Sequence, residues 1–258
     1  MIKFFRKIRQ GLLNENKFTK YLIYAIGEIA LVVIGILIAL QLNNWNVKQK
    51  SESLKIELLT NLKSELQNDL VRLDVTDQFL EDRKRYSSQL LEYFEEIPKK
   101  IDSVQVILAI ERCGYAHTFN PSMPTYNEMK GSGNLSLIQS NSLTRALANY
   151  ETFIYNSLSI EERYANTMTD FSNTAMKYMD PQFGFIDIKD TIAQEYQGLN
   201  FDLKAMAADD ELVTLTKIVL NRTIVEKRCK EDLIKPRIIN AIELIDIELN
   251  DSIKYKRS

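Results

Sequence analysis

Hydrophobic and polar positions follow three patterns along this chain. Residues 21–42 are almost wholly apolar, residues 51–96 carry apolar side chains at helical spacing, and the rest shows shorter helical stretches between loops. Apolar residues that recur every three to four positions are typical of helices that bury one side. Gly and Pro are scarce, at 8 and 5 residues, so turns are too few for a many-stranded sheet protein. We therefore expect an all-α fold.

The apolar run at residues 21–42 reads YLIYAIGEIALVVIGILIALQL. A helix of this length spans about 33 Å, slightly more than the roughly 30 Å hydrocarbon core of a bilayer. A cleaved signal peptide would have a shorter apolar run and would end in a small-x-small motif. This run instead ends with Ala39, Leu40, Gln41 and Leu42, and Asn43 follows it. The pattern predicts a transmembrane helix that acts as an uncleaved signal anchor.

Charge is divided unevenly by this span. The total is -2, but residues 1–20 carry +5 and residues 43–258 carry -6. Because basic flanks stay in the cytoplasm, we expect a cytoplasmic N-terminus and 216 residues on the opposite side. Trp45 has the position of an interfacial aromatic anchor. The basic residues expected to set topology and contact headgroups are Lys3, Arg6, Lys7, Arg9, Lys17 and Lys20.

Two alternatives stay open for residues 1–20. Phe4, Phe5, Ile8 and Leu12 fall near one side of a helix, which predicts a basic amphipathic segment lying on anionic lipid headgroups. The other alternative is a disordered basic tail whose only role is to set topology.

Glu28 is the one charged residue of the span. A carboxylate facing lipid at this depth costs on the order of 2 to 3 kcal/mol. Helical spacing places Glu28, Val32, Gly35 and Ala39 on one face, together with Leu42 at the end of the span. Because Gly35 and Ala39 allow close helix approach, this face predicts a homo-oligomer or docking on another inner-membrane protein. The alternatives are a proton relay, a coupling site for an ion-driven machine, and a carboxylate that reaches interfacial water.

Two segments resemble a known family. Residues 15–46, ENKFTKYLIYAIGEIALVVIGILIALQLNNWN, resemble the N-terminal signature of single-pass membrane proteins from Bacteroidota that are described only as a domain of unknown function. Residues 124–138, PTYNEMKGSGNLSLI, are similar to an internal block of the same family. The resemblance implies an inner-membrane anchor with a periplasmic helical domain, and it carries over no catalytic residue.

Residues 51–96 contain neither Gly nor Pro and predict a long helix. The leucines at 62, 66, 70 and 73 are spaced 4, 4 and 3 apart, which favours an eleven-residue repeat and a nearly straight helix over a heptad coil. This helix either continues the membrane helix as a stalk or begins after the polar cluster Asn43, Asn44 and Asn46.

The rest of the chain predicts short helices within residues 102–200 and a long helix over 209–250. Asp102 and Thr125 each begin a stretch of capping-box form, and Gly131 with Gly133 predicts a helix end. Asp180–Gly184 is expected to be irregular and Thr191 to cap a short turn. Pro236 either kinks the last helix or restarts it.

We expect helices 51–96 and 209–250 to form an antiparallel pair in an extracytoplasmic bundle, with the shorter helices packed between them or on top. Residues 43–258 would then form one periplasmic domain. The basic end at residues 254–257 would return toward the lipid headgroups.

No catalytic, metal or cofactor site is predicted. The single histidine, His117, follows Cys113 by four residues, but Gly114 lies between them and no HxxxH, HExxH or CxxC motif accompanies them. Gly131-Ser132-Gly133 lacks the spacing and the lysine of a P-loop. The near-neutral total charge argues against a nucleic-acid partner.

Cys113 and Cys229 are the two cysteines. In an oxidising periplasm they could form a disulfide between the middle region and the last helix. Two independent buried thiols are the equally favoured alternative.

Three functions follow from these patterns. The first is a non-enzymatic, membrane-anchored scaffold or accessory subunit that oligomerises or docks through its span. The second is a periplasmic ligand-binding sensor that signals through a single span, against which the cytoplasmic arm offers no output domain. The third, an enzyme, has no catalytic constellation to support it.

Overall fold

The computed structural model describes residues 18–100, 102–180 and 200–257, and these residues are helical apart from loops and one isolated bridge between Met179 and Phe201. This confirms the all-α class. The α-helices are α2 (Phe18–Glu95), α3 (Ser103–Gly114), α4 (Pro124–Ser132), α5 (Asn141–Ala175), α7 (Leu203–Ala208), α8 (Asp210–Cys229) and α9 (Lys235–Arg257). Two short 3₁₀ helices, η1 (Asn134–Leu137) and η2 (Met176–Tyr178), and one π-helix, η3 (Lys230–Ile234), complete the described elements.

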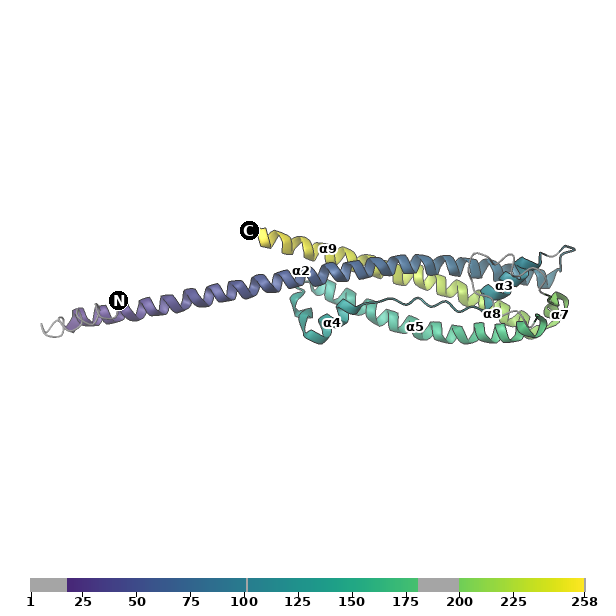
Figure 1. Ribbon diagram of the computed structural model, residues 1–258, viewed down its shortest axis with the longest axis horizontal. Helices are drawn as coiled ribbons and strands as arrows, with labels where there is room; N and C mark the ends of the chain where they lie inside the picture. The colour runs from purple at the N-terminus through teal and green to yellow at the C-terminus, as the bar shows by residue number, and fades with distance from the viewer. Residues whose placement is uncertain (1–17, 101, 181–199, 258) are drawn as a thin grey trace.

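Helix α2 runs without a break through the apolar span and the long helix that follows it. Its 78 residues correspond to about 117 Å. The polar cluster at Asn43, Asn44 and Asn46 does not interrupt it, so the stalk alternative is the correct one. The N-terminal part of α2 projects away from all other helices (Figure 1).

Beyond residue 50, α2 lies beside α8 and α9, and α5 packs against these helices (Figure 1). Six ion pairs join α2 to the C-terminal helices. As the residue number rises along α2, the partner's number falls or stays the same: Lys55–Glu248, Lys63–Asp246, Asp74–Lys235, Asp77–Lys227, Glu81–Lys227 and Arg83–Glu226.

The buried side of α2 has a heptad period, so the predicted eleven-residue repeat is wrong. One column holds Glu52, Leu59, Leu66, Leu73, Leu80 and Ser87. The second column holds Lys55, Leu62, Asp69, Thr76, Arg83 and Leu90. Alternating steps of three and four residues are the spacing of a coiled-coil seam. The prediction failed because it counted apolar residues only, while polar side chains occupy four of the six positions in the second column.

The predicted C-terminal helix 209–250 consists of α8, η3 and α9. Asp209 caps α8 by accepting hydrogen bonds from the backbone N–H groups of Glu211 and Leu212. The π-helix η3 lies directly before Pro236, where the sequence predicted a kink or a restart. A π-turn changes which carbonyl each N–H reaches, and it therefore accommodates a residue that has no N–H.

Two of the predicted caps have different outcomes. Asp102 caps α3 through hydrogen bonds from Val104 N and Gln105 N, as predicted. Thr125 does not cap α4, because Met123 is the N-cap residue, without a side-chain hydrogen bond, and Pro124 is the first helical residue. Instead, Thr125 N and Oγ1 both donate to the Glu65 carboxylate of α2.

The glycine pair ends α4 as predicted. Gly133 has φ of 77°, a left-handed conformation that glycine adopts without strain, and it separates α4 from η1. Helix α5, with 35 residues, is longer than the short helices expected within 102–200. The predicted cap at Thr191 and most of the irregular segment near Pro181 lie outside the described residues.

Two apolar clusters form the core. The cluster nearer the N-terminal projection is built around Leu62, Leu66, Leu147, Tyr150 and Ile238. The far cluster is built around Leu90, Ile107, Phe171, Met206 and Val219. On α2 the first cluster ends at Leu73 and the second begins at Tyr86, so Thr76 and Arg83 lie between them.

Candidate functional site

Three features are candidates for function, and the first is the apolar part of α2. The described residues of this span are solvent-exposed in the isolated protomer apart from Ala25, which is partly exposed, and none is buried. One helix in the described chain is long and apolar enough to cross a membrane, and it is this one. Val32 is 55% exposed, and Glu28, Gly35 and Ala39 are exposed on the same helix.

Within this span, two glycines have open surroundings. A Cβ added at Gly27 or at Gly35 would have no atom of the protomer within 4 Å beyond the helix's own backbone. A larger residue at either position therefore creates no clash inside one protomer.

Most of the predicted topology residues precede the part of the chain that the structure describes. Lys3, Arg6, Lys7, Arg9 and Lys17 lie outside the described residues, and Lys20 is described only as part of α2. Trp45 is 62% exposed, three residues beyond the end of the apolar run. An exposed Trp just beyond the end of an apolar span is typical of helices that end at a membrane interface.

The second feature is a buried polar layer between the two apolar clusters. It consists of Thr76, Arg83, Glu161, Thr223, Glu226 and Lys230, which come from α2, α5, α8 and η3 and are all buried. Arg83 Nη2 donates to Glu226 Oε2 at 2.5 Å, and Arg83 Nε donates to Thr223 Oγ1 at 2.8 Å. Lys230 Nζ bridges the two carboxylates, at 3.1 Å from Glu226 Oε1 and 2.6 Å from Glu161 Oε1.

The polar layer is balanced in charge and hydrogen bonding. Its two cations face two carboxylates, and Glu161 also accepts hydrogen bonds from Phe119 N at 3.0 Å and Ser157 Oγ at 3.2 Å. Burial raises the pKa of the Glu161 carboxyl, and the neighbouring Lys230 ammonium opposes that rise. Because buried charges are tolerated only when paired and hydrogen-bonded, this layer fixes the relative positions of four helical segments.

The structure also places His117 and the two cysteines, the residues considered above for metal, catalytic or disulfide chemistry. His117 stacks on Phe79 at 5.0 Å between ring centroids, and its Nε2 lies 3.2 Å from Thr76 Oγ1. Burial lowers the pKa of His117. Cys113 and Cys229 are free thiols, so the structure does not contain the disulfide that was one of two alternatives. Burial raises the pKa of the Cys113 thiol to about 12, which keeps it protonated and unreactive.

Carboxylates of α2 also hold the segment before α4. Asp69 is fully buried and accepts hydrogen bonds from Ser122 N at 3.1 Å and from the Tyr150 hydroxyl at 3.0 Å. Burial raises the pKa of Asp69, while these hydrogen bonds oppose the rise. Together with the Glu65 contact to Thr125, they fasten the loop and the N-terminus of α4 to the stalk.

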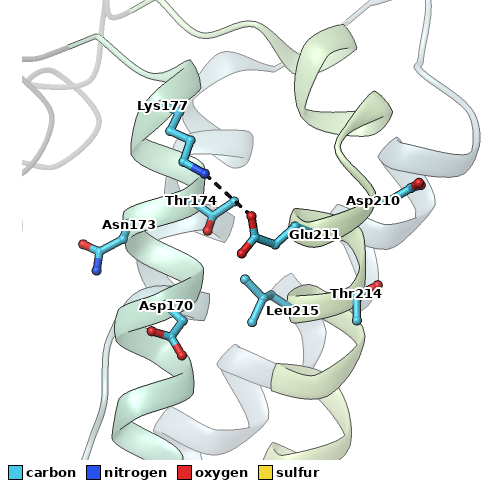
Figure 2. A pocket seen from close by; sticks show the side chains of 8 residues that line it. All are labelled: Asp170, Asn173, Thr174, Lys177, Asp210, Glu211, Thr214 and Leu215. Carbon is cyan, nitrogen blue, oxygen red and sulfur yellow. Dashed lines mark ion pairs between the residues drawn. The ribbon is translucent and has the colours of Figure 1, made fainter.

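The third feature is an open cleft of about 570 Å³ between the end of α5 and the start of α8, at the end of the molecule far from the apolar span. Figure 2 shows Lys177 of η2, which directly follows α5, reaching toward Glu211 of α8, with 3.7 Å between Nζ and Oε2. The other lining residues are Asp170, Asn173, Thr174, Asp210, Thr214 and Leu215. The described residues contain no group of three metal-ligating side chains, here or elsewhere.

The polar layer was missed in the sequence, although a signal for it exists. Between Leu80 and Leu90 the apolar stripe of α2 has a gap, and the heptad positions in that gap are Arg83 and Ser87. Polar residues at core positions predict buried partners elsewhere. Glu226 and Lys230 also have the i,i+4 spacing of an ion pair. Only the fold shows that Glu161, from α5, completes the set.

Comparison with known proteins identifies the family but no role. No curated protein and no solved structure is significantly similar to the chain. The model of a family of unknown function, DUF6090, matches residues 28–221, which is most of the chain and includes part of the span. The chain belongs to the DUF6090 family of unknown function.

Proposed function

We propose that this protein is a helical scaffold or accessory subunit that a single transmembrane helix anchors in the membrane. The N-terminal arm lies in the cytoplasm, residues 21–42 cross the inner membrane, and residues 43–258 stand in the periplasm. The observation that carries the proposal is the apolar part of α2, which no other described element covers although it is continuous with the packed stalk. A helix segment of this length with apolar side chains exposed on all sides is unfavourable in water and is favoured in a lipid bilayer.

The packed part of α2 supports the scaffold role. We infer that α2 and the α8–η3–α9 segment form an antiparallel pair, because the partner numbers across their six ion pairs fall from 248 to 226 as the α2 numbers rise. The 53 residues from Asn43 to Glu95 extend about 80 Å as one helix. A rigid rod of this length would hold its far end well away from the membrane.

The face with Glu28, Val32, Gly35 and Ala39 is the proposed association surface. Close packing on Gly35 and Ala39 would bring Glu28 against a polar partner on the neighbouring helix and lower the cost of a carboxylate in lipid. A second copy of the chain would supply the same residues. Another inner-membrane protein is the alternative partner.

The association surface is tested by paired glycine substitutions. Gly35→Leu should dissociate the complex purified in lipid nanodiscs, because it blocks helix approach without clashing inside the protomer. Gly27→Leu is the matched control, since it has equally open surroundings but lies about 100° around the helix from Glu28. Glu28→Ala should weaken association and Glu28→Gln should retain it.

Mass measurement and identification of the copurified chains report the result. A homo-oligomer or a stoichiometric partner that is lost with Gly35→Leu and kept with Gly27→Leu supports the proposal. A monomer in the unmodified chain, or equal effects of both leucines, contradicts the association surface.

The distal cleft favours a second candidate function. A sensor would bind a ligand between α5 and α8 and pass a change along α2 to the membrane. A ligand retained by the purified protein and lost on Thr214→Trp, a substitution in the cleft lining, would support this function.

A further inference from the structure

The end of α9 returns to the base of the stalk, beside the part of α2 that follows the apolar run (Figure 1). Lys55 Nζ lies 3.7 Å from Glu248 Oε1, which places residue 248 of α9 at the height of residue 55 of α2. Glu248 also accepts a hydrogen bond from Gln139 N at 2.9 Å, and Ser252, one turn farther along α9, is still buried. Helix α9 is therefore held against the stalk close to its C-terminal end.

Helix geometry gives the height of that end above the membrane. From Glu248 to Arg257, α9 descends nine residues, or about 13 Å. From Lys55 to Leu42, where the apolar run ends, α2 descends thirteen residues, or about 20 Å. The last turn of α9 thus lies about 6 Å above the end of the span, within the headgroup layer of roughly 5 to 8 Å.

The charge of the chain changes sign at this height. We define the basal collar as residues 43–50 of α2 and 251–257 of α9. It holds one acidic residue, Asp251, and five basic residues, Lys48, Lys50, Lys254, Lys256 and Arg257, so its net charge is +4. The rest of residues 43–258 carries 22 basic and 32 acidic residues, a net charge of -10.

Exposed apolar side chains accompany these charges. Trp45 is 62% exposed, Val47 55% and Ile253 41%, and none of them belongs to either core cluster. Basic residues combined with exposed aromatic and aliphatic side chains are typical of surfaces that rest at the headgroup boundary.

We propose that the basal collar binds anionic phospholipid headgroups of the leaflet from which the stalk emerges. The contact ties α9, and through it the bundle, to the membrane at a second point beside the span. The strongly acidic remainder of the domain is repelled by the same anionic surface, so the stalk is held upright. This inference rests on the proposed membrane insertion of residues 21–42.

The test uses the full chain reconstituted in vesicles of phosphatidylcholine alone or mixed with phosphatidylglycerol. Lipids carrying a nitroxide on the headgroup quench nearby fluorophores. A cysteine-linked fluorophore is placed at Ile253→Cys and, as the matched control, at Ile239→Cys, both in a Cys229→Ser background. The two isoleucines are each 41% exposed on α9, but residue 239 stands about 21 Å higher.

We expect strong quenching at position 253, little at position 239, and an increase at 253 when phosphatidylglycerol is present. The combined variant Lys254→Gln, Lys256→Gln and Arg257→Gln should abolish the dependence on phosphatidylglycerol. The control variant Lys84→Gln, Arg85→Gln and Lys204→Gln removes the same charge from exposed or half-buried positions above the collar and should leave the dependence intact.

Trp45, the only tryptophan, separates failure of this inference from failure of the proposed function. If headgroup nitroxides quench Trp45 but quench position 253 no more than position 239, the span is inserted and the collar inference is overturned. Quenching at 253 that is equal in both lipid mixtures also overturns it. If Trp45 itself is not quenched, the proposed insertion fails.

Discussion

Arg83 and Lys230 show how this bundle keeps charge in its interior. Each is about 1% exposed, and together they neutralise Glu161 and Glu226 while Thr223, Ser157 and a backbone N–H complete the hydrogen bonds. Such an arrangement adds little net stability compared with an apolar core, but loss of one member leaves an uncompensated buried charge. The polar layer therefore selects one alignment of helices over others that bury the same leucines.

This role predicts a large effect of a single substitution. Arg83→Met should lower the free energy of unfolding by about 3 to 5 kcal/mol, because one cation then remains for two buried carboxylates. Denaturant titration of the detergent-solubilised protein, followed by circular dichroism, measures the change.

Two variants control for this effect. Arg85→Met removes an exposed arginine that pairs with Asp82 on the same helix, and it should cost less than about 1 kcal/mol. Adding Glu226→Met to Arg83→Met should recover much of the lost stability, because the remaining pair of Lys230 and Glu161 is balanced. An Arg83→Met protein as stable as Arg85→Met would contradict the role given to the layer.

At the scale of elements, the spacing of the buried residues along the α8–η3–α9 segment is the main constraint on how that segment packs. From α8 to the first residue of η3 the buried residues form a stripe at 212, 216, 219, 223, 226 and 230, with alternating steps of four and three. The next step should be three, but the stripe continues at Ile234, one residue late, and then resumes its alternation at 238, 241, 245, 248 and 252. The π-helix η3 absorbs this extra residue, which is the usual origin of a π-turn within a long helix.

A deletion tests this explanation. Removing Asp232, an exposed residue of η3, together with Pro236→Ala should convert the segment to regular α-helix, keep the stripe in phase and leave the protein folded. The proline must be replaced because in a regular helix it would cost about 3 kcal/mol. Removal of Glu243, an exposed residue within regular α9, is the matched control.

The Glu243 deletion should destabilise the protein strongly, since it turns Ile245, Glu248 and Ser252 away from α2. Thermal unfolding of both deletion variants measures the difference. Equal loss of stability in the two would show that η3 is not an absorbed insertion.

These elements also show what the sequence could predict. The helical class, the apolar span, the cap at Asp102 and the start of the last helix at residue 209 follow from local patterns, because each depends on residues close together in the sequence. The stalk repeat was misjudged because Asp69, Thr76 and Arg83 occupy core positions that an apolar count omits. Their partners Tyr150, His117 and Glu226 lie 41 to 143 residues away, and local spacing contains no information about such pairs.

At the scale of the whole molecule, the charge of the chain varies with distance from the apolar span. A +5 arm precedes the span, a +4 collar follows it, and the remaining domain carries -10. Together with a continuous helix of about 117 Å, this order describes a rod with one end suited to lipid and a far end suited to water. The near-neutral total of -2 hides this separation.

The central claim is that residues 21–42 cross the membrane with the bundle outside the cytoplasm, and thiol labelling in intact spheroplasts tests it most directly. The variants Gln10→Cys and Lys204→Cys, each with Cys229→Ser, are treated with a membrane-impermeant maleimide before and after permeabilisation. Lys204 is exposed on α7, and the remaining Cys113 is buried. We predict labelling at position 204 in intact spheroplasts and at position 10 only after permeabilisation; the reverse order, or equal labelling of both positions in intact spheroplasts, would contradict the account.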